Sequence, residues 1–244
     1  MSWWSSIRPV VWRDTLLAEF DAWLPEGEYI DFFTGNHYKG GRKMRLYRNL
    51  ESLPVLVKAG GIVPMAEDCR SHLENPERLE VQIFNGADGL FTMYEDQDGR
   101  MATTTFAFTH GNRSVLTVRT AGDAGVIPEN RSYCLKFRGM EKPLSVSAET
   151  WEYDDETRIL TVFAAGKDLR VVIELADGAI AAPEKTAAVY ALLHRAQIAY
   201  ELKTAIFETV SSGEDTARIL GDLYRLNLES NLLGALVEWL ICDR

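Results

Sequence analysis

The chain has 244 residues, of which 46% are hydrophobic and 25% charged, so it can bury one large core or two small ones and is not globally disordered. Its formal net charge of −10 argues against a nucleic-acid binder, because such proteins use Lys and Arg to neutralise phosphates. The same charge argues against binding to anionic membrane surfaces. A neutral or cationic small molecule, such as a sugar, is compatible with it.

The N-terminal segment, MSWWSSIRPVVWRDTLLAEF, has neither a basic n-region nor an uninterrupted apolar run, so it does not resemble a signal peptide. The longest apolar stretch, LPVLVKAGGIVPM, contains Lys58 and is too short to span a bilayer. We therefore expect a cytoplasmic protein that binds neither membranes nor nucleic acid. Residues 1–23 form an atypical segment in which we expect the indoles of Trp3, Trp4 and Trp12 to pack in an ordered way, because exposed they would promote aggregation.

Residues 24–66 predict a first, proximal β-domain. The aromatic run YIDFF ends at the turn signal TGN, and the segment KMRLYR then alternates like a strand. Because alternate residues of a strand point to opposite faces, Met44, Leu46 and Arg48 fall on one face. Two further strand-like runs flank AGG, which predicts a bend between them.

Residues 67–182 predict a second, distal β-domain. Alternating segments are separated by turn signals: LEVQIF, LFTMYE, TTTFAFTH, RSVLTVRTA, RSYCLKFRG, RILTVFAA and LRVVIEL. Short strands at such regular spacing predict an antiparallel β-sandwich. We expect Trp151 in its core.

Residues 183–244 predict a small helical tail. Apolar residues keep helical spacing through AAVYALLHRAQIAYELKTAIFETV, which predicts one helix. Asp215 is the expected N-cap of a second helix, TARILGDLYRL, and NLLGALVEWLI predicts a third, with Trp239 in the core. We expect these helices to dock on one another or on the distal sandwich.

Three segments, in this order, resemble the C-terminal β-domains of glycoside hydrolase family 31: WLPEGEYIDFFTGNHYKGGR, LPVLVKAGGIVPM and NGADGLFTMYEDQDG. That family contains α-glucosidases and α-xylosidases. The resemblance covers roughly residues 24–175; the segment before it departs from the family pattern, and the helical tail resembles no part of the family. It implies a mostly β fold: two antiparallel β-sandwich domains, the first lacking an edge strand or two, followed by the helical unit.

The resemblance also implies that the catalytic residues lie elsewhere. Retaining enzymes use two carboxyl groups about 5 Å apart, and this family carries both as aspartates on a (β/α)₈ barrel of at least roughly 200 residues that precedes these domains. The family's nucleophile motif, similar to Trp-x-Asp-Met-Asn, does not occur in this sequence. We therefore assign no catalytic residue and expect the chain alone to be inactive.

The expected function is that of a non-catalytic structural region of a retaining α-glycosidase that hydrolyses α-glucosides or α-xylosides. The alternative is an independent carbohydrate-binding module. The expected partner is the barrel domain, or a second copy of the chain that binds through the uncovered interface, because exposed sheet edges favour self-association.

Two groups of residues could carry chemistry, and for each we predict a structural role. The aromatic group should pack in a core or a domain interface and not stack on a sugar; it comprises Tyr29, Phe32, Phe33 and Tyr38. The carboxylate group should bond in turns and not hold Ca²⁺ or act as a catalytic pair; it comprises Asp88, Glu95, Asp96 and Asp98.

The histidines and cysteines are isolated in the sequence and have no zinc-ligand spacing. We expect the histidines in polar turns or at the surface; they are His37, His72, His110 and His194. We expect the cysteines to be free thiols in a reducing compartment; they are Cys69, Cys134 and Cys242. The sequence therefore predicts no metal site and no cofactor.

Overall fold

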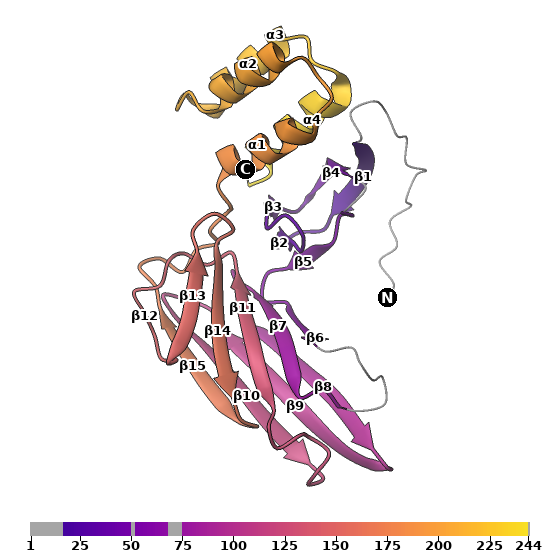
Figure 1. The fold of residues 1–244 in the computed structure, drawn as a ribbon, viewed down its shortest axis with the longest axis vertical. Coiled ribbons are helices and arrows are strands. Elements are labelled where there is room, and N and C mark those ends of the chain that lie inside the picture. The colour runs from indigo at the N-terminus through magenta and orange to yellow at the C-terminus, as the bar shows by residue number, and fades with distance from the viewer. Residues whose placement is uncertain (1–16, 50–51, 68–74, 244) are drawn as a thin grey trace. The chain divides into compact units, whose positions relative to one another are not determined.

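The computed structural model describes residues 17–49, 52–67 and 75–243 (Figure 1). The described residues are mostly β, with strands followed by a C-terminal run of helices, which confirms the predicted fold class. They form two compact units. Unit 1 combines the described parts of Met1–Leu56 and Pro183–Arg244, and unit 2 is Val57–Ala182. The three domain boundaries proposed from the sequence remain a prediction.

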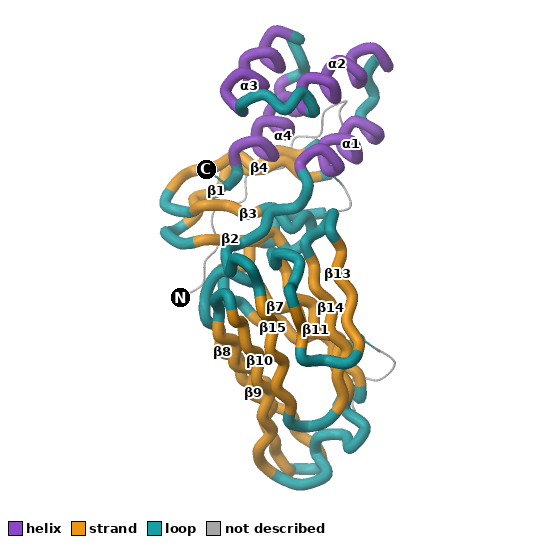
Figure 2. The backbone as a smooth tube through the Cα atoms, turned by 90° about the vertical axis from the view of Figure 1, so that its left-hand side faces the viewer, coloured by secondary structure: helices purple, strands orange, loops and turns teal. Residues whose placement is uncertain are grey.

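Unit 2 is a sandwich of two five-stranded sheets (Figure 2). The first has the order β12-β15-β10-β9-β8, with β8 (Gly89–Gln97), β9 (Arg100–Thr109), β10 (Arg113–Gly122), β12 (Ser145–Val146) and β15 (Leu169–Glu174). The second has the order β13-β14-β11-β7-β6, with β6 (Ile62–Ala66), β7 (Arg78–Phe84), β11 (Ser132–Arg138), β13 (Thr150–Asp154) and β14 (Ile159–Ala165).

The alternation of the sequence builds the core of this sandwich. In β11, Tyr133, Leu135 and Phe137 are buried while the residues between them are half-buried. Aromatic pairs join the two sheets, since Phe106 of β9 lies 6.1 Å from Tyr133 and Phe108 lies 6.0 Å from Phe137 between ring centroids. Such contacts add to the burial of apolar area.

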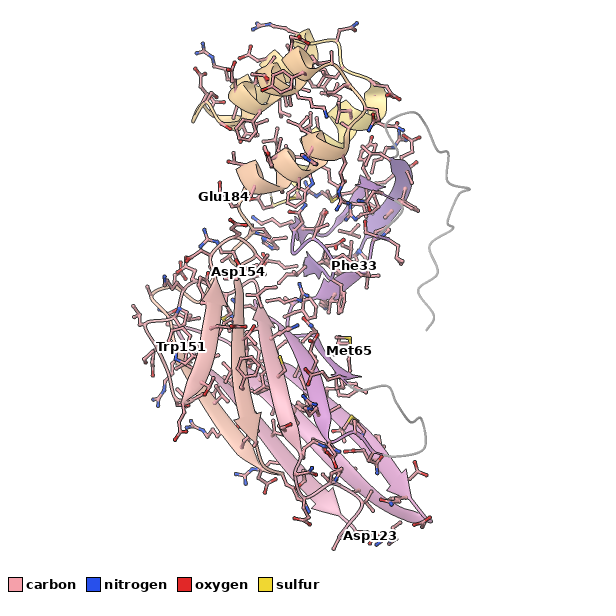
Figure 3. The ribbon with its side chains drawn as sticks, in the orientation of Figure 1. Phe33, Met65, Asp123, Trp151, Asp154 and Glu184 are labelled. Atoms are coloured by element: carbon pink, nitrogen blue, oxygen red, sulfur yellow. The ribbon has the colours of Figure 1, made fainter. Side chains whose placement is uncertain are left out.

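Two details of unit 2 differ from the prediction. The pair β7–β11 is parallel, because the strands between them in the sequence belong to the other sheet. Trp151 was expected in the core, but it lies on the edge strand β13 and is 39% exposed (Figure 3). An edge strand has a neighbour on one side only, so a large side chain there stays partly in water.

The β-part of unit 1 has two small sheets. In the first, β1 (Ala18–Leu24) pairs antiparallel with β4 (Arg42–Arg48). In the second, the order is β3-β2-β5, with β2 (Glu28–Asp31), β3 (His37–Lys39) and β5 (Leu56–Lys58), and the boundary between the units falls inside β5. The sequence analysis predicted no strand where β1 lies.

The C-terminal part of unit 1 consists of four helices: α1 (Lys185–Arg195), α2 (Tyr200–Val210), α3 (Thr216–Arg225) and α4 (Ser230–Ile241). Their apolar faces share one core, as predicted, and Asp215 caps α3 by accepting a hydrogen bond from the Arg218 N–H. The single long helix predicted before Asp215 was wrong. Ala196 and Ala199 adopt extended conformations, and the break between them lets α1 and α2 pack on each other.

Helix α4 also packs against β4. A small apolar cluster between the β-part and the end of α4 contains Leu24, Tyr38, Met44, Leu46 and Cys242. Among the described residues, no helix is long and apolar enough to cross a membrane.

Candidate functional site

The predicted aromatic group lies in and beside the β2–β3 hairpin of unit 1. Tyr38 is fully buried in the apolar cluster, and Tyr29 packs against that cluster. Phe33 is 50% exposed, and its ring contacts that of Phe32 edge-on, with 5.3 Å between the centroids. Tyr38 and Tyr29 therefore serve the core, while Phe33 faces outward.

The turn that carries Phe33 is held by the carboxylate of Asp31. Its Oδ1 accepts hydrogen bonds from the backbone N–H groups of Phe33, at 2.8 Å, and Thr34, at 2.9 Å. This is an Asx-type turn, in which a side chain replaces a backbone acceptor. The other oxygen, Oδ2, accepts a hydrogen bond of 2.7 Å from Arg48 Nη2.

Arg48 is the centre of a buried polar network. Its Nη1 donates to Glu238 Oε1 at 2.7 Å, and its Nη2 lies 3.1 Å from the Tyr38 hydroxyl. That hydroxyl in turn donates to Glu238 Oε1 at 2.6 Å. The side chains of Asp31, Arg48 and Glu238 are at most 4% exposed. A residue of α4 is thus joined to two strands of the β-part.

The same carboxylate covers part of the open side of β4. Glu238 Oε2 accepts the backbone N–H of Tyr47 at 2.7 Å, a donor that points away from the partner strand β1. Backbone N–H groups on the open edge of a sheet are often covered by a helix or a loop. Further along α4, the carbonyl of Cys242 accepts hydrogen bonds from Arg42 Nη2 at 2.8 Å and from the Lys39 N–H at 3.3 Å.

Burial shifts the pKa values in this network. It raises the pKa of Glu238, although the Arg48 guanidinium opposes this shift. It raises the pKa of Tyr38 well above its usual value, and the negative charge of Glu238 adds to this. Burial alone would lower the pKa of Arg48, but Tyr38, Glu238 and Asp31 together raise it.

These shifts keep Arg48 charged and Tyr38 protonated at neutral pH. A retaining glycosidase needs one carboxylate free to attack a sugar and another free to donate a proton. Asp31 and Glu238 are instead both bound to one guanidinium and are closed to solvent. The arrangement can hold α4 and the Asp31 turn in place, and it offers no approach for a substrate.

The carboxylate group of unit 2 is dispersed. Glu95 was predicted to bond in a turn, but it lies in β8, is buried, and forms an ion pair with the fully buried Arg131; its Oε2 also accepts a hydrogen bond of 2.9 Å from Thr104. Glu95 lies on the same face of β8 as Met93, which packs against the core, and a carboxylate is tolerated there only when it is paired.

The other members of that group remain at the surface. Asp96 and Asp98 are exposed, and Asp98 has a positive φ of 52° at the tip of the β8–β9 hairpin. Asp88 Oδ1 accepts the N–H of His110 at 2.8 Å. No cluster of three or more potential metal-binding side chains occurs among residues 17–49, 52–67 and 75–243.

The histidines have separate environments. His37 was expected in a polar turn or at the surface, but it is buried in β3, where its Nε2 lies 3.3 Å from Glu28 Oε2 and burial lowers its pKa. His110 Nδ1 lies 2.9 Å from Asn85 Oδ1, and His194 is exposed at the end of α1. His72 lies outside the described residues.

The two described cysteines, Cys134 and Cys242, are free, and burial raises the pKa of both, to about 12 for Cys242. Their thiols are therefore poor nucleophiles at neutral pH. Cys69 and the three N-terminal tryptophans lie outside the described residues.

The residues that matter most in unit 1 left weak signals in the sequence. Arg48 continues the buried side of an otherwise apolar alternation in β4, and Glu238 is the one acidic residue within the apolar α4. A charge on a buried face implies a partner. Nothing in either segment indicates that the two charges meet.

Comparison with known proteins identifies the class of domain. Residues 7–63 match the family model described as glycosyl hydrolase family 31 C-terminal domain. An alpha-xylosidase from Saccharolobus solfataricus is 27% identical over 104 residues, which cover 42% of this chain and 14% of that protein. Alpha-glucosidase 2 from Bacillus thermoamyloliquefaciens is 30% identical over 93 residues, which cover 37% of this chain and 11% of that protein.

The fold is also similar to that of solved structures from the same family. The structure of a family 31 dextranase from Flavobacterium johnsoniae, in complex with isomaltotriose, matches with a TM-score of 0.55 and 22% identity over 69% of this chain and 25% of that chain. Residues 7–63 are thus similar to the C-terminal domain of glycoside hydrolase family 31, and the chain spans only 14% of the alpha-xylosidase and 11% of alpha-glucosidase 2, the two curated relatives. Its described residues include no catalytic barrel. The family match begins at residue 7, before the start at Leu24 that the sequence motifs suggested, and so includes β1.

Proposed function

We propose that the chain is a non-catalytic structural region of a retaining α-glycosidase that acts on α-glucosides or α-xylosides. The family match over residues 7–63 carries this proposal, and the names of two relatives, alpha-xylosidase and alpha-glucosidase, support the proposed class of substrate. The chemistry of the buried acids supports it. Asp31, Glu95 and Glu238 are all engaged by arginine in water-excluded positions, where they stabilise the fold and cannot reach a sugar.

The proposed partner is the catalytic barrel domain of the same enzyme. Three large apolar side chains of the β-part of unit 1 are strongly exposed: Trp23 at 62%, Phe33 at 50% and Leu53 at 57%. Exposed apolar side chains of this size are candidates for an interface. A barrel that covered them would bury apolar area worth about 25 cal/mol per Å².

The proposed location is the cytoplasm. Cys134 and Cys242 are unpaired, as is usual in a reducing compartment.

A carbohydrate-binding module is the second candidate, and one feature of unit 2 favours it. Tyr94 of β8 is 71% exposed beside a hollow of 280 Å³ that is also lined by Asp96 and Met101. An exposed aromatic ring with a nearby carboxylate has the components of a sugar-binding site, a stacking face and a hydrogen-bond acceptor.

Calorimetric titration with maltose, isomaltotriose and a methyl α-xyloside separates the two candidates. The scaffold predicts no heat of binding up to millimolar sugar. A module predicts a heat that disappears in Tyr94→Ala. Tyr224→Ala is the matched control, because Tyr224 is similarly exposed, at 63%, but lies on α3. A sugar-dependent heat that is lost in Tyr94→Ala but kept in Tyr224→Ala would show that the chain is a carbohydrate-binding module and not a scaffold.

A further inference from the structure

The helical tail lies outside the residues that match the family model, yet α4 is hydrogen-bonded to that matched segment. Near its start, Asn231 Nδ2 donates to the carbonyl of Leu17 at 3.3 Å. In its middle, Glu238 binds Arg48 and the N–H of Tyr47, and at its end the Cys242 carbonyl accepts from Arg42. The helix therefore runs antiparallel to β4 along its open side.

Close packing accompanies these bonds. Gly234 of α4 faces Tyr47, and a Cβ atom at Gly234 would lie 2.1 Å from the Tyr47 hydroxyl oxygen and 2.7 Å from Cε2 of the ring. A side chain at this position would force the Tyr47 ring, or α4 itself, to move. Gly221 of α3 offers a contrast, since a Cβ atom there would meet nothing within 4 Å.

The network continues from α4 to the outward-facing turn. Glu238 holds Arg48, Arg48 holds Asp31 Oδ2, and Asp31 Oδ1 holds the N–H groups that set the turn of Phe33 and Thr34. If the Glu238 carboxylate is removed, Asp31 is the remaining carboxylate of this network, and the buried Arg48 charge is attracted toward it. Because a carboxylate group is rigid, a shift of one oxygen moves the other.

We propose that the C-terminal helical unit positions the Asp31–Asn36 turn through Glu238, Arg48 and Asp31, so that docking of α4 sets how Phe33 is presented to the barrel domain. The identity of the partner rests on the proposed function, whereas the coupling between α4 and the turn does not. Glu238 is then a positioning residue. The helical tail stabilises the turn through which the β-part of unit 1 would contact the barrel domain.

Amide hydrogen exchange of the full chain tests the coupling with Glu238→Ala. The amides of Phe33 and Thr34, which do not contact Glu238, should exchange at least tenfold faster than in the unmodified chain, together with that of Tyr47. Glu208→Ala, which removes an exposed glutamate in the last turn of α2, is the matched control and should leave all three unchanged.

A second pair of variants keeps the test decisive if Glu238→Ala fails to fold. Gly234→Ala leaves every charge in place but disturbs the packing of α4 on Tyr47, and should accelerate the same three amides, while Gly221→Ala should not. Acceleration at Tyr47 without any change at Phe33 and Thr34 would overturn the proposal, because α4 would then dock without positioning the turn. Unchanged exchange at all three in Gly234→Ala would overturn it as well.

The outcome of the amide-exchange experiments does not depend on whether the parent protein is a glycosidase. Sugar titrations can fail while the exchange coupling holds, and the coupling can fail while the family function stands.

Discussion

Among the described residues, each of the two units buries one arginine against a glutamate, and the two pairs are built differently. In unit 2, Glu95 and Arg131 are 36 residues apart, and the pair lies in a sandwich with an extensive apolar core. In unit 1, Arg48 and Glu238 are 190 residues apart, and the apolar cluster around them is small.

The difference shows what each pair contributes. A buried ion pair adds little net stability over an apolar replacement, but removing one partner costs several kcal/mol. The core of unit 2 would hold its strands together without the pair. In unit 1 the network itself joins segments from opposite ends of the chain, so it determines which segments belong together.

Breaking the network of unit 1 at its centre should give the largest effect. Arg48→Met leaves Asp31 and Glu238 buried without their shared cation, and we expect unit 1 to lose about 5 kcal/mol of stability. Urea unfolding followed by amide exchange in each unit checks this. Unit 2 should keep its protection, and a comparable loss in both units would show that the network is not specific to unit 1.

The corresponding change in unit 2 should cost less. Glu95→Ala leaves the fully buried Arg131 unpaired, and we expect a loss of about 3 kcal/mol from unit 2. Glu129→Ala is the control, because the Glu129 side chain is 86% exposed and its ion pair with Lys167 is open to water. If both variants unfold at the same urea concentration, the buried pair has no special role.

A smaller test removes one hydroxyl. Tyr38→Phe deletes the donor to Glu238 and one contact of Arg48 but keeps the buried ring, and should cost unit 1 about 2 kcal/mol. Tyr200→Phe, at a ring that is 79% exposed, should be neutral. Equal midpoints for Tyr38→Phe and the unmodified chain would mean that the hydroxyl is dispensable.

The smallest expected effect depends on pH. Burial lowers the pKa of His37, so the unfolded chain binds a proton below about pH 6.5 while the folded chain resists it. The stability of unit 1 should therefore be fully present above that pH and fall as the pH falls below it.

Melting temperatures at pH 7.5 and 5.5 measure this fall. His37→Gln should reduce the difference between the two temperatures, and His194→Gln, at an exposed position, should not. A larger difference in His37→Gln would contradict the sign of the pKa shift.

Much of unit 2 could be predicted from the sequence because its strands are formed by local alternation. LEVQIF and RILTVFAA fall within or beside β7 and β14, and each turn signal between such segments is visible by itself. The position of Trp151 could not be predicted, since alternation gives the face of a strand but not whether the strand lies at an edge.

Unit 1 was less predictable because its structure depends on distant contacts. No Gly or Pro marks the break between α1 and α2, and no Gly or Pro marks the start of β1, although Pro25 and Gly27 follow its end. The alternation predicted that Met44, Leu46 and Arg48 share one face of β4, and that face is buried, but the partner of the Arg48 charge lies in a helix 190 residues away. The family motifs indicated the class of protein without indicating what the tail does.

We propose above that this chain contributes structure and not chemistry to a family 31 enzyme. The direct measurement is hydrolysis of 4-nitrophenyl α-glucoside and α-xyloside by the purified 244-residue chain. The account predicts no release of nitrophenol above the buffer rate at any protein concentration. Release proportional to protein concentration, and retained through repeated purification, would contradict it.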